Sequence, residues 1–354
     1  MSLIAYVTRI HFADRVVEDA LPVELRRLGL SRPLIVTDEA GRRGDAFDRI
    51  LDALPPGAAA AAAPAPDRLS PEALLAAARR FEAAGADGVI GLGGPVALDL
   101  ARALAKAGPE SAGAREPVPM IAAPTTTASV GLGPVSSALG LSCAAPTPAL
   151  LICDPTLTME AGPQETAAAG MDALIHCLEA FLCATWNPPA DGIALDGMRR
   201  AAAHVEHAVR DGADPDARRE LLAAALDAGL AAQKGLGGVR ALAHALEEET
   251  GRAPRHGELH IALVGPVLAF NAPALEAKLE AAAEALRLPA GQEPGAGLAA
   301  LGARLGLPAR LGPLDIGEPA LRRAARRAAE DPATQTNPRL ATMEDYLRIL
   351  EDAR

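Results

Sequence analysis

Three side chains that can bind one metal ion lie on two predicted helices in the second half of the chain. Asp172 and His176 are four residues apart in an Ala- and Leu-rich stretch, so on a helix both project from the same face. His256 lies on a later helical stretch and can supply a third ligand from across a cleft. A carboxylate and two imidazoles can hold one metal ion and leave a coordination position open. The spacing predicts a catalytic metal site.

A glycine-rich turn at residues 91–99 is a second candidate site. It follows a short apolar run and precedes a helical stretch. Gly93 and Gly94 let backbone N–H groups approach a pyrophosphate, and the start of the following helix adds a partial positive charge. Pro95 contributes no N–H donor and Val96 no hydroxyl, which weakens such a site. The alternative is a tight strand-to-helix turn that binds nothing.

Two kinds of secondary structure are expected to position these residues. In the first half of the chain, short apolar runs alternate with helical stretches, which is typical of a parallel sheet covered by helices. The stretch from Pro71 to Gly85 is helical, with Ser70 as its N-cap. The Pro- and Ala-rich tract 55–66 favours a surface connection. The runs that we expect to form strands are residues 34–37, 89–92, 120–123 and 150–153.

From about Pro163 onward the strand signals end, and amphipathic helices rich in Ala and Leu continue to the last residue. We therefore expect two domains. Residues 1–160 form an α/β, Rossmann-like dinucleotide-binding domain, and residues 161–354 form an all-helical domain that carries the metal-site residues.

Composition excludes several classes of partner. Half of the 354 residues are apolar and only 2% are aromatic, so the core must be built from small aliphatic side chains. The net charge of -11 argues against a nucleic acid or an anionic membrane as partner, and an anionic substrate needs a local basic pocket. No apolar run approaches the ~20 residues of a membrane span, and Met1–Thr8 lacks the features of a signal peptide. We expect a cytoplasmic protein.

These residues and their order resemble the iron-containing (group III) alcohol dehydrogenases and their maleylacetate reductase branch. The resemblance covers essentially the whole chain and extends to Arg9-Ile10-His11-Phe12 near the start and Asn337-Pro338-Arg339 near the end. It implies a dehydroquinate-synthase-like architecture, NAD(H) as cofactor, a divalent iron or zinc ion, a small-molecule substrate and a homodimer.

The resemblance also assigns residues to the cofactor site. Gly93, Gly94 and Asp99 stand in register with the family's glycine motif, although Pro95 and Val96 replace its third glycine and its serine.

Asp38 follows the predicted strand 34–37, where the family places an acid near the adenosine ribose, and its charge favours NAD over NADP. Thr125 and Thr126 match a loop that lines the cofactor. The segment after them, within residues 128–150, is shorter than in the family and lacks its lysine.

At the metal site, Asp172, His176 and His256 match three of the family's four ligands. The fourth ligand position, four residues before His244, is Arg240. A guanidinium has no lone pair to donate and stays charged, so it repels a divalent cation. Three ligands can still hold a metal, but less tightly.

Arg240 admits two other interpretations. With His244, His256 and His260 it can form an anion site, because its planar fork suits a carboxylate. Alternatively, it forms an ion pair with Asp172 and replaces the metal. The first interpretation predicts a small carboxylic acid, such as an oxo-acid, as the substrate.

The leading hypothesis is an NAD(H)-dependent oxidoreductase, similar to maleylacetate reductase, that interconverts a small carbonyl compound and its alcohol. A metal or Arg240 polarises the substrate oxygen, and His244 or His260 relays the proton. The alternative is a non-redox lyase, isomerase or cyclase that kept the fold and lost metal and dinucleotide binding. A third hypothesis is a catalytically inactive binding partner.

Overall fold

A computed structural model describes residues 8–58, 60–66, 68–108, 117–128, 130–132, 147–250, 256–312 and 316–354. The described chain divides into two compact units, one ending at Ala161 and one beginning at Gly162. The sequence places the boundary one residue earlier.

The first unit contains a six-stranded sheet in the order β1-β6-β5-β4-β2-β3, with all neighbouring strands parallel. Four of its strands coincide with the predicted runs, which confirms the α/β prediction. Their side chains are buried on both faces, as in sheets that helices cover on both sides. The strands are β1 (Arg9–Phe12), β2 (Pro33–Thr37), β3 (Ala61–Pro64), β4 (Gly88–Gly93), β5 (Met120–Pro124) and β6 (Leu150–Cys153).

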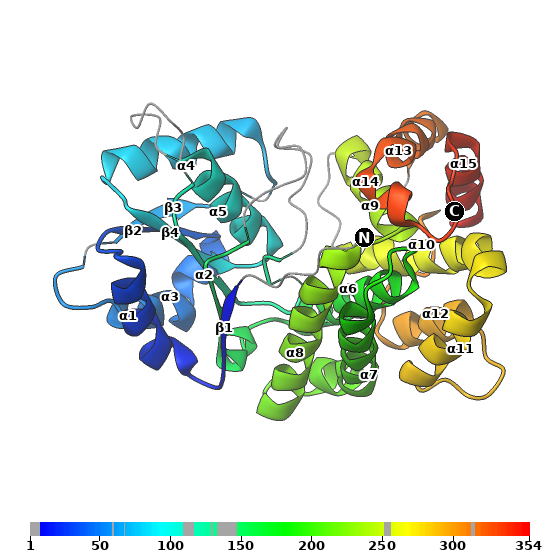
Figure 1. The fold of residues 1–354 in the computed structure, drawn as a ribbon, viewed down its shortest axis with the longest axis horizontal. Coiled ribbons are helices and arrows are strands. Elements are labelled where there is room, and N and C mark those ends of the chain that lie inside the picture. The colour runs from blue at the N-terminus through cyan, green and yellow to red at the C-terminus, as the bar shows by residue number, and fades with distance from the viewer. Residues whose placement is uncertain are drawn as a thin grey trace. The chain divides into compact units, whose positions relative to one another are not determined.

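Helices cover both faces of this sheet (Figure 1). On one face, α1 (Val16–Leu28) and α3 (Asp45–Asp52) bury aliphatic side chains against β2, β4, β5 and β6. On the other lie α4 (Pro71–Ala83) and α5 (Pro95–Ala107), while the short α2 (Glu39–Arg43) follows β2. Ser70 caps α4 by accepting a hydrogen bond from the backbone N–H of Ala73, as predicted.

The prediction of a surface connection over residues 55–66 was wrong for β3. Ala61–Pro64 pairs in parallel with β2, in the register Leu34 with Ala61. Alanine and proline are both depleted in strands, so the composition of this tract gives no strand signal. The neighbouring strand decides the conformation by supplying partners for the backbone groups.

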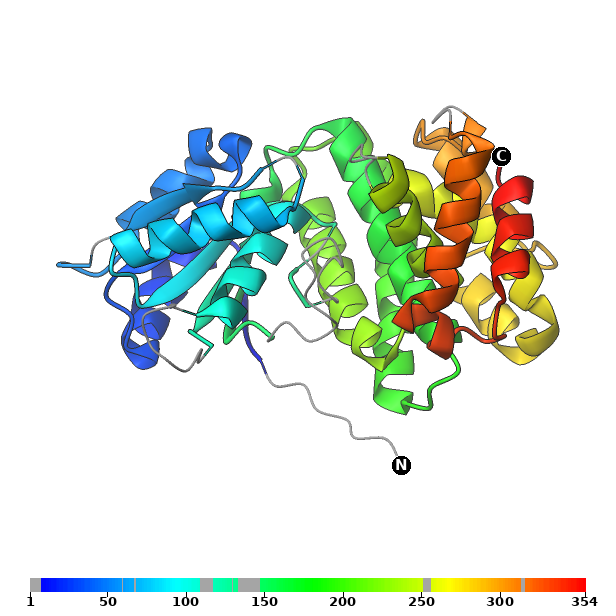
Figure 2. The same ribbon diagram turned by 90° about the horizontal axis from the view of Figure 1, so that it is seen from above.

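The second unit is all-helical, as predicted, and glycines at the helix contacts leave room for side chains of the neighbouring helix. A Cβ atom on Gly170 of α6 would lie 2.5 Å from Val205 of α7, and one on Gly197 of α7 would lie 2.5 Å from the sulfur of Cys177. Figure 2 shows α15 running beside α13. The helices are α6 (Pro163–Leu182), α7 (Pro188–Arg210), α8 (Pro215–Ala231), α9 (Gly238–Thr250), α10 (His256–Asn271), α11 (Glu276–Ala285), α12 (Pro294–Arg304), α13 (Glu318–Glu330), α14 (Pro332–Thr336) and α15 (Met343–Asp352).

Among the described residues, no helix combines the length and apolar character that crossing a membrane requires.

A buried carboxylate joins β1 to α1. Glu24 is 1% exposed and contacts Arg9 at 2.9 Å, His11 at 2.9 Å and Arg27. Burial acts to raise the pKa of Glu24, but hydrogen bonds from His11, Arg27 and Arg9 outweigh it and lower the pKa from 4.5 to about 2. This cluster explains why Arg9 and His11 occur together near the start of the chain.

The Glu24→Gln variant is expected to lose about 2 kcal/mol of stability near neutral pH, allowing for the solvent around the arginines. Because the pKa is lower in the folded state, the stabilisation is complete above pH 4.5 and is lost as the pH falls towards about 2. Urea unfolding near pH 7 and near pH 3 should show the difference from wild type shrinking at the lower pH. Glu330→Gln, in an exposed pair with Arg326, is the control and should change little. A pH-independent difference would contradict the assignment.

Candidate active site

Two helices bring the candidate site together. Asp172 and His176 lie one turn apart on α6, a helix buried around most of its circumference. Helix α10 approaches it at Gly257, where a Cβ atom would lie 1.9 Å from the carbonyl oxygen of Ala168. Only glycine permits this backbone contact, and one turn later on the same helix His260 reaches α6.

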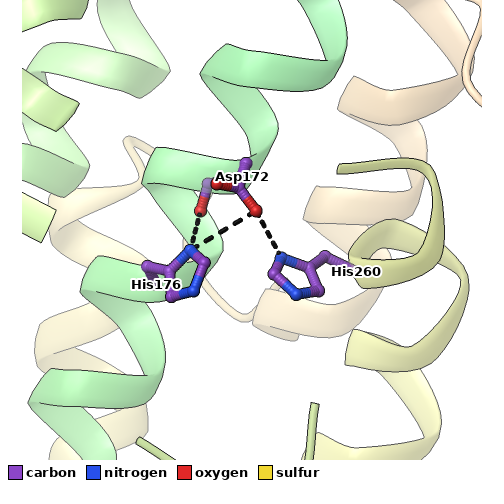
Figure 3. Close-up of side chains that lie close together, drawn as sticks. All are labelled: Asp172, His176 and His260. Carbon is purple, nitrogen blue, oxygen red and sulfur yellow. Dashed lines mark hydrogen bonds and ion pairs between the residues drawn. The ribbon is translucent and has the colours of Figure 1, made fainter. Parts of the chain in front are cut away.

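Asp172 lies between two imidazoles (Figure 3). Its Oδ1 atom lies 2.8 Å from Nδ1 of His260 and 3.4 Å from Nδ1 of His176. Nδ1 of His176 also lies 3.0 Å from the carbonyl oxygen of Asp172. The two rings meet edge to face, with their centroids 4.9 Å apart.

Burial and charge determine the protonation of this cluster. Burial acts to raise the pKa of Asp172, but His176 and His260 lower it well below the usual range. Burial acts to lower the pKa of His176, and the carboxylate of Asp172 outweighs it and raises that pKa. For His260 burial dominates, and its pKa is lowered despite Asp172. Asp172 therefore stays ionised and supplies the negative charge of the cluster.

Arg240, in the first turn of α9, brings a permanent positive charge to this cluster. Its Nη1 atom lies 3.5 Å from Nε2 of His176. Within the described chain, the carboxylate of Asp172 pairs with the two imidazoles, and the guanidinium contacts the far side of one of them. Between the described residues Arg240 and Asp172 there is no direct ion pair, which was the alternative to an anion site at Arg240.

The other two predicted histidines lie in different positions. His244 is one turn after Arg240 on α9, and its Nδ1 atom lies 3.7 Å from Oδ2 of Asp331. Burial and the charge of Arg240 lower the pKa of His244 to about 4, so it is neutral at neutral pH. His256 begins α10, but its side chain lies outside the described residues, and its role as a ligand stays a prediction.

The donor set fits a divalent metal. Asp172, His176 and His260 each offer one ligand atom, and these atoms lie within 4.8 Å of one another. One carboxylate and two imidazoles are ligands common to zinc and iron. Arg240 opposes binding, because its guanidinium directs a positive charge at Nε2 of His176. His260, which the sequence indicated as a proton relay, is the third member of the group.

In the α/β unit, the predicted cofactor residues gather at the carboxyl ends of neighbouring strands. A Cβ atom on Gly93, at φ 142°, would lie 3.1 Å from the carboxylate of Asp38. Among the residues that the structure describes, one on Gly94 would meet only Thr126, at 3.6 Å, and the N–H of Thr125 donates to the carbonyl of Gly93. These ends of a parallel sheet are where dinucleotides bind. The geometry leaves the backbone of Gly94 open to a phosphate, which fits the cofactor.

The two substitutions in the glycine loop fall in the first turn of α5. Gly94 is the N-cap, and Pro95 takes the first helical position, where an N–H has no partner within the helix. The helix forms normally, and one potential phosphate donor is missing. Asp99 lies one turn further and pairs with Arg102 at 3.5 Å. Residues 129 and 133–146 of the segment after the threonines lie outside the described residues.

Comparison with known proteins identifies the family. A model described as "Fe-containing alcohol dehydrogenase family, C-terminal" matches residues 166–354, and one described as "Iron-containing alcohol dehydrogenase" matches residues 8–133. The chain belongs to the iron-containing alcohol dehydrogenase family. It is therefore an oxidoreductase, and NAD binding is typical of its family.

Individual members of the iron-containing alcohol dehydrogenases resemble the chain over most of its length. A 4-hydroxybutyrate dehydrogenase of Cupriavidus necator is 34% identical, over 100% of both chains. A maleylacetate reductase of Rhizobium sp. (strain MTP-10005) is 30% identical, over 87% of this chain and 86% of its own. The crystal structure of a 1,3-propanediol oxidoreductase has the same fold, with a TM-score of 0.88, 23% identity and 100% coverage of both chains.

Glu179 is a residue of this site that the sequence patterns do not mark. It lies three residues after His176 on α6, is 7% exposed, and accepts hydrogen bonds from the backbone of α9. Burial raises the pKa of Glu179 to about 7, against the backbone N–H groups of Val239 and Arg240, which lower it. The available signal was a further acidic residue on a largely apolar helix, three residues after His176.

Proposed function

We propose that this protein catalyses the NAD(H)-linked interconversion of a short hydroxy acid and the corresponding oxo-acid. The observation that carries the proposal is the guanidinium of Arg240, 3.5 Å from an imidazole of the Asp172–His176–His260 group. A planar, permanently charged donor beside the site of carbonyl chemistry suits a substrate with a carboxylate at one end and an alcohol or aldehyde at the other.

The names of two relatives support this substrate class. 4-Hydroxybutyrate and maleylacetate, named for the relatives from Cupriavidus necator and Rhizobium, both carry carboxylates.

Each described residue has a distinct task in this proposal. Arg240 binds the carboxylate and so orients the reacting carbon. Asp172 fixes the ring of His260 through Nδ1 and holds the imidazoles in place. His244 relays the proton of the alcohol, because it is neutral at neutral pH and can accept one. Its Nδ1 atom faces Asp331, so we assign proton uptake to Nε2.

Two groups from solution complete the reaction. Asp38, Gly93, Gly94 and Thr126 would hold NAD(H), which would supply the hydride in reduction or accept it in oxidation. A divalent metal held by Asp172, His176 and His260 would polarise the substrate oxygen.

The test compares 4-hydroxybutyrate with n-butanol, which has the same carbon chain without the carboxylate. With NAD⁺, we expect kcat/KM to be about 100-fold higher for the hydroxy acid. Calorimetric titration with NADH and NADPH, together with metal analysis, tests the two groups from solution, and tighter binding of NADH is expected from Asp38. Equal rates on both alcohols would exclude the hydroxy-acid assignment. Absence of NADH binding and of metal would favour the non-redox lyase, isomerase or cyclase.

A further inference from the structure

The first turn of α9 is held by side chains from other elements. Gly237, which precedes the helix, has no side chain to cap it. The N–H of Gly238 donates to Oδ1 of Asn337 at 3.0 Å, and the N–H groups of Val239 and Arg240 donate to the two carboxylate oxygens of Glu179 at 2.8 and 3.0 Å. These donors have no acceptor within the helix, because intrahelical bonding starts only at the following residues.

Further hydrogen bonds hold Asn337, one of the two residues that cap α9. The amides of Asn337 and Asn271, the last residue of α10, form a reciprocal pair of hydrogen bonds at 3.0 and 2.8 Å. The side-chain amide of Asn337 also donates to the carbonyl of Arg339 at 2.6 Å. A buried, fully paired amide has one orientation, so the cap is rigid. Through Asn337, the Asn-Pro-Arg stretch near the chain end thus contacts the first turn of α9.

Both ends of Arg240 are therefore attached to the same helix. Its backbone N–H binds Glu179 of α6, and its guanidinium contacts His176, one turn earlier on α6. A shift of α9 along α6 would break the backbone contact and move the guanidinium away from the imidazole.

We propose that Glu179 is a positioning residue, which fixes Arg240 for carboxylate binding by holding the first turn of α9. The inference rests on the proposed function for the role of Arg240 in substrate binding. Glu179 itself acts through backbone amides and has no contact with the substrate.

The main test is the Glu179→Gln variant. An amide oxygen can accept one of the two hydrogen bonds, but the amide nitrogen faces the second N–H and repels it. We expect faster hydrogen–deuterium exchange at residues 238–240, about tenfold weaker binding of 4-hydroxybutyrate by calorimetry, and little change in KM for n-butanol. The exposed Glu280→Gln of α11 is the matched control and should change none of these.

Gly237→Ala tests the same cap without altering the carboxylate. A Cβ atom there would lie 2.8 Å from Oδ1 of Asn337 and 2.9 Å from Oε1 of Glu179, so the cap must open. Gly237→Ala should reproduce the selective loss of hydroxy-acid binding. If Glu179→Gln does not fold, Gly237→Ala still tests whether the cap positions Arg240.

A double-variant cycle distinguishes positioning from general destabilisation. In an Arg240→Gln background, Glu179→Gln should change 4-hydroxybutyrate binding by less than about twofold, because its effect passes through Arg240. The positioning role would be overturned if the double variant lost affinity for 4-hydroxybutyrate by the product of the two single losses. Unchanged amide exchange in Glu179→Gln would overturn it as well. If the wild-type protein does not prefer 4-hydroxybutyrate over n-butanol, the proposed function is refuted. Hydrogen–deuterium exchange at residues 238–240 would still test whether Glu179 holds the first turn of α9.

Discussion

The Asp172→Asn variant is expected to lose almost all activity, with kcat/KM lowered about 10³-fold. The amide has the shape of the carboxylate but not its charge. His176 would then face the guanidinium of Arg240 without a negative group beside it, and His260 would lose the carboxylate at its Nδ1 atom. The orientation of the two imidazole rings and the affinity for a divalent cation both depend on the charge of the Asp172 carboxylate. Without it, the group that would polarise the substrate oxygen is lost.

Steady-state kinetics and metal analysis of the purified variant check this expectation. Asp227→Asn is the matched control, because Asp227 is another partly buried carboxyl of the helical unit, which pairs with Arg200 at 3.7 Å. Burial raises the pKa of Asp227 to about 7, so an amide is a mild change there, and activity should remain within about twofold. Retention of more than about a tenth of wild-type kcat/KM in Asp172→Asn would remove Asp172 from the centre of the chemistry.

Sequence alone predicted the two-part architecture because the relevant signals are local. Buried parallel strands need continuous apolar runs, and Leu34–Thr37 is such a run. Ala61–Pro64 was missed because its strand conformation depends on a neighbour and not on its own composition.

The candidate site was predictable in part for the same reason. Asp172 and His176 share one helix, so their spacing fixes their relation. The third group depends on how α10 meets α6. His256 and His260 are one turn apart, and spacing does not tell which of them reaches Asp172. The backbone contact at Gly257 brings His260 there, and no periodicity reports such a contact.

Glu179 shows the limit most clearly. Its partners are the backbone N–H groups of Val239 and Arg240. Almost every residue type has such a group, so this contact leaves no pattern in the sequence. A cap formed by a residue of another helix has none of the local signature of a Ser, Thr or Asp cap. Only the packed structure connects this glutamate to Arg240.

Replacing Arg240 with Gln is expected to raise KM for 4-hydroxybutyrate about 100-fold and to leave n-butanol almost unaffected. The glutamine keeps a hydrogen-bond donor but loses the charge and the planar fork that bind a carboxylate at two points. Kinetics on both substrates give the measurement, and Arg322→Gln is the control, since Arg322 is an exposed residue of α13 that pairs with Glu318 at 3.0 Å and serves no proposed step. An equal loss on both alcohols would mean that Arg240 acts on the reacting oxygen and not on the carboxylate.

Arg240→His separates the two effects of the guanidinium. An imidazole at this position removes the positive charge beside His176 and adds a lone pair where, by the family resemblance, the fourth ligand belongs. We therefore expect this variant to retain more zinc or iron than wild type after dialysis, while its KM for 4-hydroxybutyrate rises as in Arg240→Gln. Metal retention equal to wild type would show that Arg240 does not limit the affinity of the site. Tight metal binding without the rise in KM would assign the substrate carboxylate to another residue. A higher affinity for the metal together with a lower affinity for the substrate carboxylate would indicate that Arg240 replaced a metal ligand with an anion-binding group.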